Sequence, residues 1–161
     1  MKISLIVAVG LNNQIGLNGK LPWYSKEDLA YFREKTMNHM VVMGRKTFEG
    51  LPKKLDGRKI IVLSRTQKNI DDVLIASSIQ EVIDIAKQGN ESELFIAGGE
   101  SVYRQFIEVA DKIYLSKINY NGPSDTFFPK MDETKWEKAQ ENKFCDGSWI
   151  NYVKKTDDGL F

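Results

Sequence analysis

Three aliphatic segments of this chain each end in a turn where a helix is predicted to begin, and each turn carries a glycine or a cation. They lie in VVMGRKTF (41–48), IIVLSR (60–65) and FIAGGESVY (95–103). In open α/β sheets, ligands bind at the carboxyl ends of the parallel strands. Three such turns therefore predict a parallel sheet with a dinucleotide laid across its carboxyl edge, an arrangement typical of an enzyme.

The cations in these turns indicate that the bound group is an anion. Arg45 and Lys46 open a predicted helix, where the partial positive charge of the helix N-terminus makes a cation locally unfavourable. An anion held between these cations and the free N–H groups would remove the conflict. Because cations near the ribose favour a 2′-phosphate, Arg45, Lys46 and Arg65 predict NADP(H), although each could also be an ordinary surface charge.

The rest of the pattern predicts one α/β domain that spans residues 1–161. A near-continuous aliphatic run at 3–9 is typical of a parallel strand covered on both faces. Residues 11–23 are rich in Asn and Gly and predict a long loop. The last β-rich segments have no helix between them, so we expect an antiparallel hairpin. Strands are predicted at 3–9, 40–43, 59–63, 73–75, 94–97, 112–118, 136–144 and 149–155, and helices from 25, after 45, at 79–88 and at 101–109.

Composition excludes several other classes of protein. Lys and Arg total 23 against 22 Asp and Glu, for a formal net charge of +1, whereas a nucleic-acid platform needs a strong basic excess. One Cys and one His leave no soft-ligand metal cluster, and the lone Cys fits a reducing cytosol. The opening MKISLIVAVGL is too short to span a bilayer and is interpreted as a buried strand.

Asp28 has two interpretations. In a capping box, an acid at the third helical position reaches back to the backbone N–H of Ser25. However, Trp23, Leu29 and Phe32 surround this carboxylate with apolar groups, and an acid in such a pocket is costly unless it meets a cation or a pair of donors. A planar ligand with two parallel N–H groups would satisfy it.

Arg58, in LDGRK, is either a turn residue before a strand or a bidentate clamp on a carboxylate. The pair Gly98-Gly99 departs from the G-x-G-x-x-G fingerprint, and a glycine pair alone is more often a tight turn. His39, in TMNHM, is interpreted as a surface residue between elements, and Cys145 as a small buried or loop thiol without a catalytic role.

In combination these motifs resemble bacterial dihydrofolate reductases, and the resemblance covers nearly the whole chain. It implies a three-layer α/β fold with a central, mostly parallel eight-stranded sheet, a C-terminal antiparallel hairpin and about four helices. The motifs that carry it are AVGLNNQIGLNGKLPW (8–23), DLAYF (28–32), VVMGRKTFE (41–49), GRKIIVLSR (57–65), FIAGGESVY (95–103) and DTFFP (125–129).

The resemblance implies that Asp28 holds a pterin ring through its 2-amino group and N3, and supports protonation of N5. Arg58 is implied to bind the glutamate α-carboxylate, and Ser116 stands where the family has a hydroxyl bonded to the acid. The implied catalytic residues are Asp28 and Trp23. The implied substrate-binding residues are Ile6, Asp28, Leu29, Phe32, Lys53, Leu55, Arg58, Ala97, Tyr103 and Ser116.

The resemblance also implies NADPH as the cofactor, with the loop from Leu11 to Tyr24 closing over its nicotinamide. Gly98 and Gly99 are implied to bring the backbone against the pyrophosphate through a cis peptide bond. The implied cofactor-binding residues are Ala8, Gln14, Ile15, Gly16, Leu17, Asn18, Gly19, Lys20, Gly44, Arg45, Lys46, Thr47, Leu63, Ser64, Arg65, Ser77, Gly98, Gly99, Glu100, Ser101, Val102, Tyr103 and Gln105; no metal is implied.

Three positions depart from the family pattern. Ala97 stands where a larger aliphatic residue usually precedes the glycine pair, Glu100 replaces a frequent third Gly, and Lys53 replaces a frequent Arg. None of them touches the implied core chemistry, although Ala97 bears on how substrate and inhibitors pack.

The implied reaction is NADPH-dependent reduction of 7,8-dihydrofolate to 5,6,7,8-tetrahydrofolate, with hydride added at C6 and a proton at N5, which supplies one-carbon metabolism and thymidylate synthesis. A cytoplasmic monomer that binds antifolates, but neither nucleic acid nor membrane, is also implied. Two alternatives remain open: a reductase of the same fold acting on a pyrimidine of riboflavin synthesis, and a non-catalytic nucleotide-binding module. The first would not need Asp28 or Arg58, and the second would leave Asp28 and the Pro22-Trp23 segment without a purpose.

Overall fold

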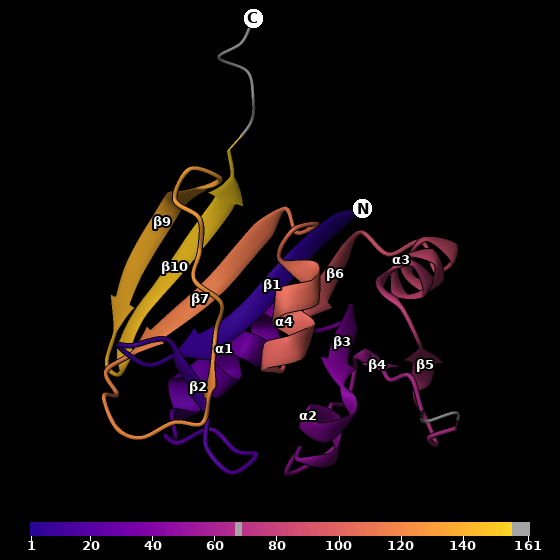
Figure 1. Ribbon diagram of the computed structural model, residues 1–161, viewed down its shortest axis with the longest axis horizontal. Coiled ribbons are helices and arrows are strands. Elements are labelled where there is room, and N and C mark those ends of the chain that lie inside the picture. The colour runs from indigo at the N-terminus through magenta and orange to yellow at the C-terminus, as the bar shows by residue number, and fades with distance from the viewer. Residues whose placement is uncertain (67–68, 156–161) are drawn as a thin grey trace, which may run out of the picture.

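The computed structural model describes residues 1–66 and 69–155, which form one eight-stranded sheet, a small two-stranded sheet and four helices (Figure 1). The strands of the large sheet are β1 (Lys2–Val9), β3 (Met40–Gly44), β4 (Lys59–Leu63), β5 (Leu74–Ala76), β6 (Glu93–Ile96), β7 (Lys112–Ile118), β9 (Trp136–Phe144) and β10 (Gly147–Lys154). The small sheet pairs β2 (Gln14–Gly16) with β8 (Thr126–Phe127), and the helices are α1 (Lys26–Thr36), α2 (Arg45–Glu49), α3 (Ile79–Gln88) and α4 (Glu100–Phe106).

The large sheet has the order β5-β4-β3-β6-β1-β7-β10-β9. Neighbouring strands are parallel from β5 to β7, whereas β10 runs antiparallel to both β7 and β9. The predicted mostly parallel sheet with a C-terminal hairpin is therefore confirmed. Because β4, β3 and β6 are neighbours, the three turns singled out in the sequence lie next to one another at one edge.

Helices cover both faces of this sheet. On one face, Val82 of α3 and Phe106 of α4 join a large core with Leu5 and Val7 of β1. Figure 1 shows α4 in front of the sheet and α1 behind it. The alternation of side chains along a strand sends Ile6, between Leu5 and Val7, to the opposite face. Two apolar layers therefore enclose the sheet.

The opposite face holds a smaller apolar cluster. Here Phe32 of α1 and Phe48 of α2 pack against Ile6, Val41 and Phe95, whose side chains are buried. This cluster lies between α1 and the sheet. It includes several of the residues that are predicted to bind the substrate.

The two longer helices begin at serine caps where the sequence predicts helix starts, and α3 also ends where the sequence predicts. Ser25 caps α1 and Ser78 caps α3, because each hydroxyl oxygen accepts a backbone N–H of the first turn, at 3.2 and 3.1 Å. Gly89 follows the last residue of α3. Local sequence therefore determines both boundaries.

Four predicted elements match the structure at both ends, namely 59–63, 79–88, 112–118 and 136–144. Others differ at one or both ends by one to three residues, since the last hydrogen bond of a helix or ladder sets the boundary there. The prediction that 11–23 is entirely loop is wrong, because β2 lies within it and pairs with β8. No local pattern signals a pairing so distant along the chain. The other corrected bounds are Lys2–Val9, Met40–Gly44, Leu74–Ala76, Glu93–Ile96, Glu100–Phe106 and Gly147–Lys154.

Candidate functional site

Asp28, in the first turn of α1, turns its carboxylate toward the sheet. Its Oδ1 atom accepts hydrogen bonds from the hydroxyl of Ser116 on β7, at 2.5 Å, and from the indole Nε1 of Trp149 on β10, at 2.9 Å. The cap of α1 is the Ser25 hydroxyl, which accepts the backbone N–H of Asp28. Within the residues that the structure describes, Oδ2 accepts no hydrogen bond. The carboxylate is therefore free to accept donors from a ligand.

Trp149 is a site residue that the sequence analysis missed. Its ring stacks on Tyr31 of α1 with a centroid separation of 4.6 Å, and on Phe144 of β9 at 4.0 Å. Burial, together with the charges of Asp28 and Glu34, raises the pKa of Tyr31 to about 12, so its hydroxyl stays protonated at neutral pH. The only signal in the sequence was a tryptophan in a predicted C-terminal strand, and its register opposite Ser116 is a tertiary feature.

Several residues predicted to contact the substrate belong to, or pack against, the smaller core cluster. Phe32, Leu55 and Ala97 are partly buried against the smaller core cluster, and Ile6 belongs to that cluster. Leu29 is 49% exposed, although it follows Asp28 directly on α1. A single exposed apolar side chain is common on protein surfaces, so the contact of Leu29 with the substrate stays a prediction.

Arg58 lies beside the C-terminal end of α1. Its Nη1 is 3.4 Å from the hydroxyl of Thr36, and its Nε donates to the carbonyl of Asp56 at 3.0 Å. Partial burial, and then the neighbouring charge of Arg33, hold the pKa of Arg58 below its usual value, yet a guanidinium remains cationic at neutral pH. Lys53, the other predicted cation for the substrate, is exposed.

The carboxyl ends of β3 and β6 meet closely. The backbone N–H of Gly44 donates to the carbonyl of Gly98 at 2.8 Å, and the expected cis peptide between Gly98 and Gly99 is present. A Cβ on Gly44 would come within 3.2 Å of Val102, and one on Gly99 within 3.2 Å of the Thr47 hydroxyl. A Cβ at either position would crowd a neighbouring side chain, so glycine suits both, and the two turns together form a glycine cradle.

Cations surround this cradle. Arg45 and Lys46 do begin α2, and neither α2 nor α4 has a side-chain cap. Arg45 is 4.0 Å from Glu49, an exposed pair of little energetic weight. Arg65 follows β4, where Ser64 donates its backbone N–H to the end of β5. Free N–H groups and cations at one edge match the phosphates of a dinucleotide.

The loop before α1 approaches the same edge. Asn18 and Gly19 adopt positive φ angles, and a Cβ on Gly50, after α2, would lie 3.1 Å from the carbonyl of Gly19. Asp125 anchors the loop, because its carboxylate accepts the N–H of Asn18 and its own N–H donates to the carbonyl of Gly16, both at 2.9 Å. The other loop residues predicted to contact the cofactor are Ile15, Leu17 and Lys20.

Gln14, Glu100 and Tyr103, all predicted to bind ligands, form side-chain hydrogen bonds with backbone groups of the protein. Gln14 accepts the N–H of Asn12 at 2.7 Å, Glu100 accepts the N–H of Phe127 at 2.6 Å, and the Tyr103 hydroxyl donates to the carbonyl of Ile6 at 2.8 Å. Their contacts with a ligand stay predictions. The remaining predicted cofactor residues are Ala8, which lies opposite Ser116 in the ladder, Leu63, Ser77, Ser101 and Gln105.

Trp23, predicted as a catalytic residue, packs on Tyr120 with a ring separation of 5.4 Å. Cys145 is exposed in the turn between β9 and β10, and a hydrogen bond to Glu27 raises the pKa of its thiol to about 11. The thiol is therefore no nucleophile at neutral pH. His39 is no isolated surface residue, since its Nδ1 lies 2.7 Å from the carboxylate of Glu91.

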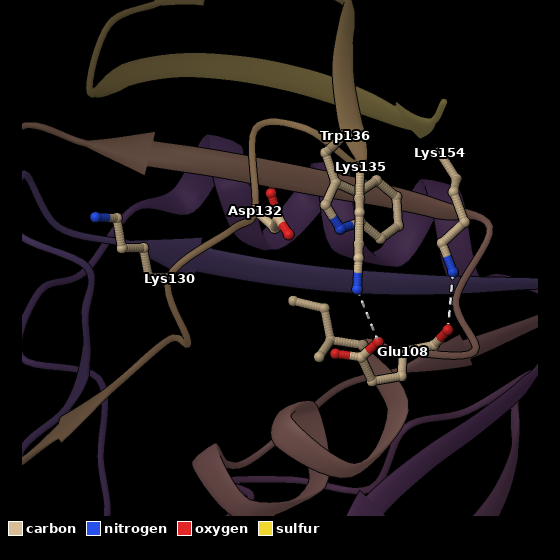
Figure 2. A pocket seen from close by; sticks show the side chains of 7 residues that line it. Glu108, Lys130, Asp132, Lys135, Trp136 and Lys154 are labelled. Carbon is tan, nitrogen blue, oxygen red and sulfur yellow. Dashed lines mark hydrogen bonds and ion pairs between the residues drawn. The ribbon is translucent and has the colours of Figure 1, made fainter. Parts of the chain in front are cut away.

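A small hollow lies elsewhere on the molecule, between α4 and the start of β9 (Figure 2). Its volume is about 60 Å³, and Lys135 and Lys154 point their amines toward Glu108 across it. These three residues line the hollow, which includes neither Asp28 nor any residue of the glycine cradle. No group of side chains suited to hold a metal ion occurs among the described residues.

Comparison with known proteins agrees with this geometry. The family model described as "Dihydrofolate reductase" matches residues 2–154. A dihydrofolate reductase from Haemophilus influenzae is 39% identical, with 96% of this chain and 100% of that protein aligned, and one from Bacillus subtilis is 35% identical, with 95% of each aligned. The solved dihydrofolate reductase from Enterococcus faecalis, complexed with NADP(H) and RAB-propyl, superposes with a TM-score of 0.88 at 31% identity, covering 96% of this chain and 97% of that one. The chain belongs to the dihydrofolate reductase family.

Proposed function

We propose that this chain catalyses NADPH-dependent reduction of 7,8-dihydrofolate to 5,6,7,8-tetrahydrofolate, with hydride added at C6 and a proton at N5. Family membership supports the reaction. The observation that carries the assignment of the site is the Asp28 carboxylate, held from two strands beside an open apolar wall. The product serves one-carbon metabolism and thymidylate synthesis.

Asp28 is proposed to bind the pterin ring. An ionised carboxylate accepts several hydrogen bonds, and the 2-amino group and N3 of the ring offer two adjacent donors. The negative charge also favours the protonated form of the ring, which lowers the barrier to reduction. We propose that a water carries the proton to N5, and that Trp23, in the neighbouring loop, helps to enclose it.

Arg58 is proposed to bind the glutamate α-carboxylate at the far end of the same helix. The rise from residue 28 to residue 36 is about 12 Å, at roughly 1.5 Å per residue. Asp28, Phe32 and Thr36 follow one another at intervals of one helical turn, so they share a face of α1. Since Arg58 lies beside Thr36, this face suits an elongated ligand with a polar head, an apolar middle and an anionic tail.

The cradle between β3, β4 and β6 fits NADPH. Gly44 and Gly99 keep the backbone open, and the uncapped starts of α2 and α4 present N–H groups suited to a pyrophosphate. Lys46 and Arg65 would hold the 2′-phosphate, and the loop around Gly19 would cover the nicotinamide. When bound, NADPH supplies the hydride that reduces C6.

Substitution of Asp28 by Asn tests this assignment. Asparagine keeps the size of the side chain and an acceptor for Ser116 and Trp149, so the free energy of unfolding should change little. The lost charge should lower turnover at pH 7 by about a hundred-fold or more, with partial recovery at lower pH, where the substrate is protonated without help. NADPH absorbance with dihydrofolate measures turnover, and urea unfolding measures stability.

A matched control is Glu27→Gln, which removes a negative charge from the same helical turn and should retain turnover. Near-normal turnover of Asp28→Asn at pH 7, or an equal loss in both variants, would contradict the assignment. Absence of dihydrofolate-dependent NADPH oxidation in the unaltered protein would reject the proposed reaction.

We also propose that residues 1–161 form a single domain that acts as a monomer in the cytoplasm and binds antifolates in the dihydrofolate site. Strands from both ends of the described chain, β1 and β10, flank β7 in one sheet, which supports a single domain. None of the described helices has the length and apolar character needed to cross a membrane. The net charge of +1 gives no basis for nucleic-acid binding. Light scattering across a concentration series should give the mass of one chain, and a dimer mass would contradict the monomer.

A further inference from the structure

The indole of Trp149 makes a direct hydrogen bond to the acid of the site. Its Nε1 lies 2.9 Å from Oδ1 of Asp28, within the range of a charge-assisted bond. An indole N–H can only donate, whereas a hydroxyl such as that of Ser116 both donates and accepts and can rotate away. The bond from Trp149 is therefore the more constant of the two, and it favours the ionised form of the carboxylate.

Aromatic rings on both sides hold this indole in place. Tyr31 of α1 stacks on one face, with planes 8° apart, and Phe144 of β9 stacks on the other, with planes parallel. Rotation of Trp149 would break both contacts. The N–H direction is therefore set before any ligand arrives.

The hairpin of β9 and β10, which carries Trp149, contacts the start of α1 at a second point. Asp146, in the turn between β9 and β10, accepts a hydrogen bond from the hydroxyl of Ser25 at 2.7 Å, and that hydroxyl also caps the helix. The backbone carbonyl of Asp146 further accepts the N–H of Asn119, just after β7. The hairpin therefore fixes both the position of the helical turn and the orientation of the carboxylate that it carries.

We propose that Trp149 is a positioning residue of the reductase site, which orients the Asp28 carboxylate and stabilises its charge so that Oδ2 faces the pterin ring. This inference rests on the proposed function of Asp28. It assigns a part in the reaction to the C-terminal hairpin, which supplies no group that touches the reacting atoms. Two donors from two different strands meet on one oxygen, and this geometry fixes the plane of the carboxylate.

Trp149→Phe keeps an aromatic ring between Tyr31 and Phe144 and removes the N–H. Turnover of dihydrofolate should fall about ten-fold, the usual effect of losing a hydrogen bond to a charged group. The midpoint of the pH–turnover profile should rise by about one unit, because the carboxylate loses a donor that favours its charged form. KM for NADPH should stay unchanged, since the cradle lies at other strands. Trp136→Phe, the same change at the far end of the hairpin, is the matched control and should alter none of these quantities.

Replacing Trp149 with the sulfur analogue β-(3-benzothienyl)alanine preserves the bicyclic shape and removes only the N–H. This variant tests the role of the N–H if Trp149→Phe folds poorly. The same loss of turnover and the same pH shift in this variant would support the proposal. Unchanged turnover and an unchanged pH midpoint in a folded variant would overturn it, as would a loss of stability without a pH shift, which indicates packing alone. Inactivity of the unaltered protein would instead reject the proposed reaction, so the two failures are distinguishable.

Discussion

Tyr103→Phe should destabilise the protein by about 1–2 kcal/mol, the usual cost of deleting one buried hydrogen bond. The Tyr103 hydroxyl donates to the carbonyl of Ile6 at 2.8 Å, and the residue is only 5% exposed. Burial raises the pKa of this phenol, so the hydroxyl keeps its proton across the accessible pH range. The variant removes the oxygen and leaves the Ile6 carbonyl with one donor fewer. For a chain of this size, the melting temperature should fall by about 3–6 °C.

Urea and thermal unfolding, followed by circular dichroism, measure this change. Tyr24→Phe is the control. Tyr24 is 78% exposed, so removing its hydroxyl should change the free energy of unfolding little. Equal stability of Tyr103→Phe and the unaltered protein would refute the reasoning. Since the Tyr103 hydroxyl is directed at Ile6, the KM values for substrate and cofactor should stay the same; a raised KM at unchanged stability would mean that the hydroxyl serves a ligand.

Three further outcomes are expected. Partial burial would raise the pKa of Glu91, but hydrogen bonds from His39 and from backbone N–H groups hold that pKa below its usual value. These bonds therefore stabilise the fold above the ordinary carboxyl range, and their effect is lost as pH falls through the lowered pKa. Glu91→Gln should be less stable by about 1–2 kcal/mol in urea at pH 7, the difference should shrink as the solution is made acidic, and a difference in the free energy of unfolding that did not change with pH would contradict this. NADPH should bind better than NADH through Lys46 and Arg65, with a gap in Kd that narrows as salt rises, and equal Kd values at low salt would reject the assignment. Ala97→Ile should strengthen the binding of diaminopyrimidine antifolates by up to about 2.4 kcal/mol, from three buried carbons at about 0.8 kcal/mol each, and an unchanged inhibition constant would show that the pocket does not use this position.

Local sequence predicted most of the fold because the signals of its elements are local. Gly89 ends α3 at its predicted boundary, the Ser78 cap seen in the structure fixes its start, and an aliphatic run forms β4. The cationic turns also belong to single segments, so their place at strand ends could be predicted. Their position side by side follows from the strand order β4-β3-β6. The short strand β2 was missed because its partner β8 lies far along the chain.

The sequence by itself determined which residues carry charge and on which predicted helix or turn each one lies. It therefore predicted Asp28, Arg58 and the glycine turns as candidate ligand-binding positions. Only the tertiary structure decided what holds the acid. The antiparallel ladder of β7 and β10 places Trp149 opposite Ser116, so their side chains share the face that Asp28 meets. A shift of one residue in that register would turn the indole to the other face of the sheet. Register depends on the packing of the whole sheet rather than on any local pattern, and for that physical reason the partners of Asp28 emerged only from the fold.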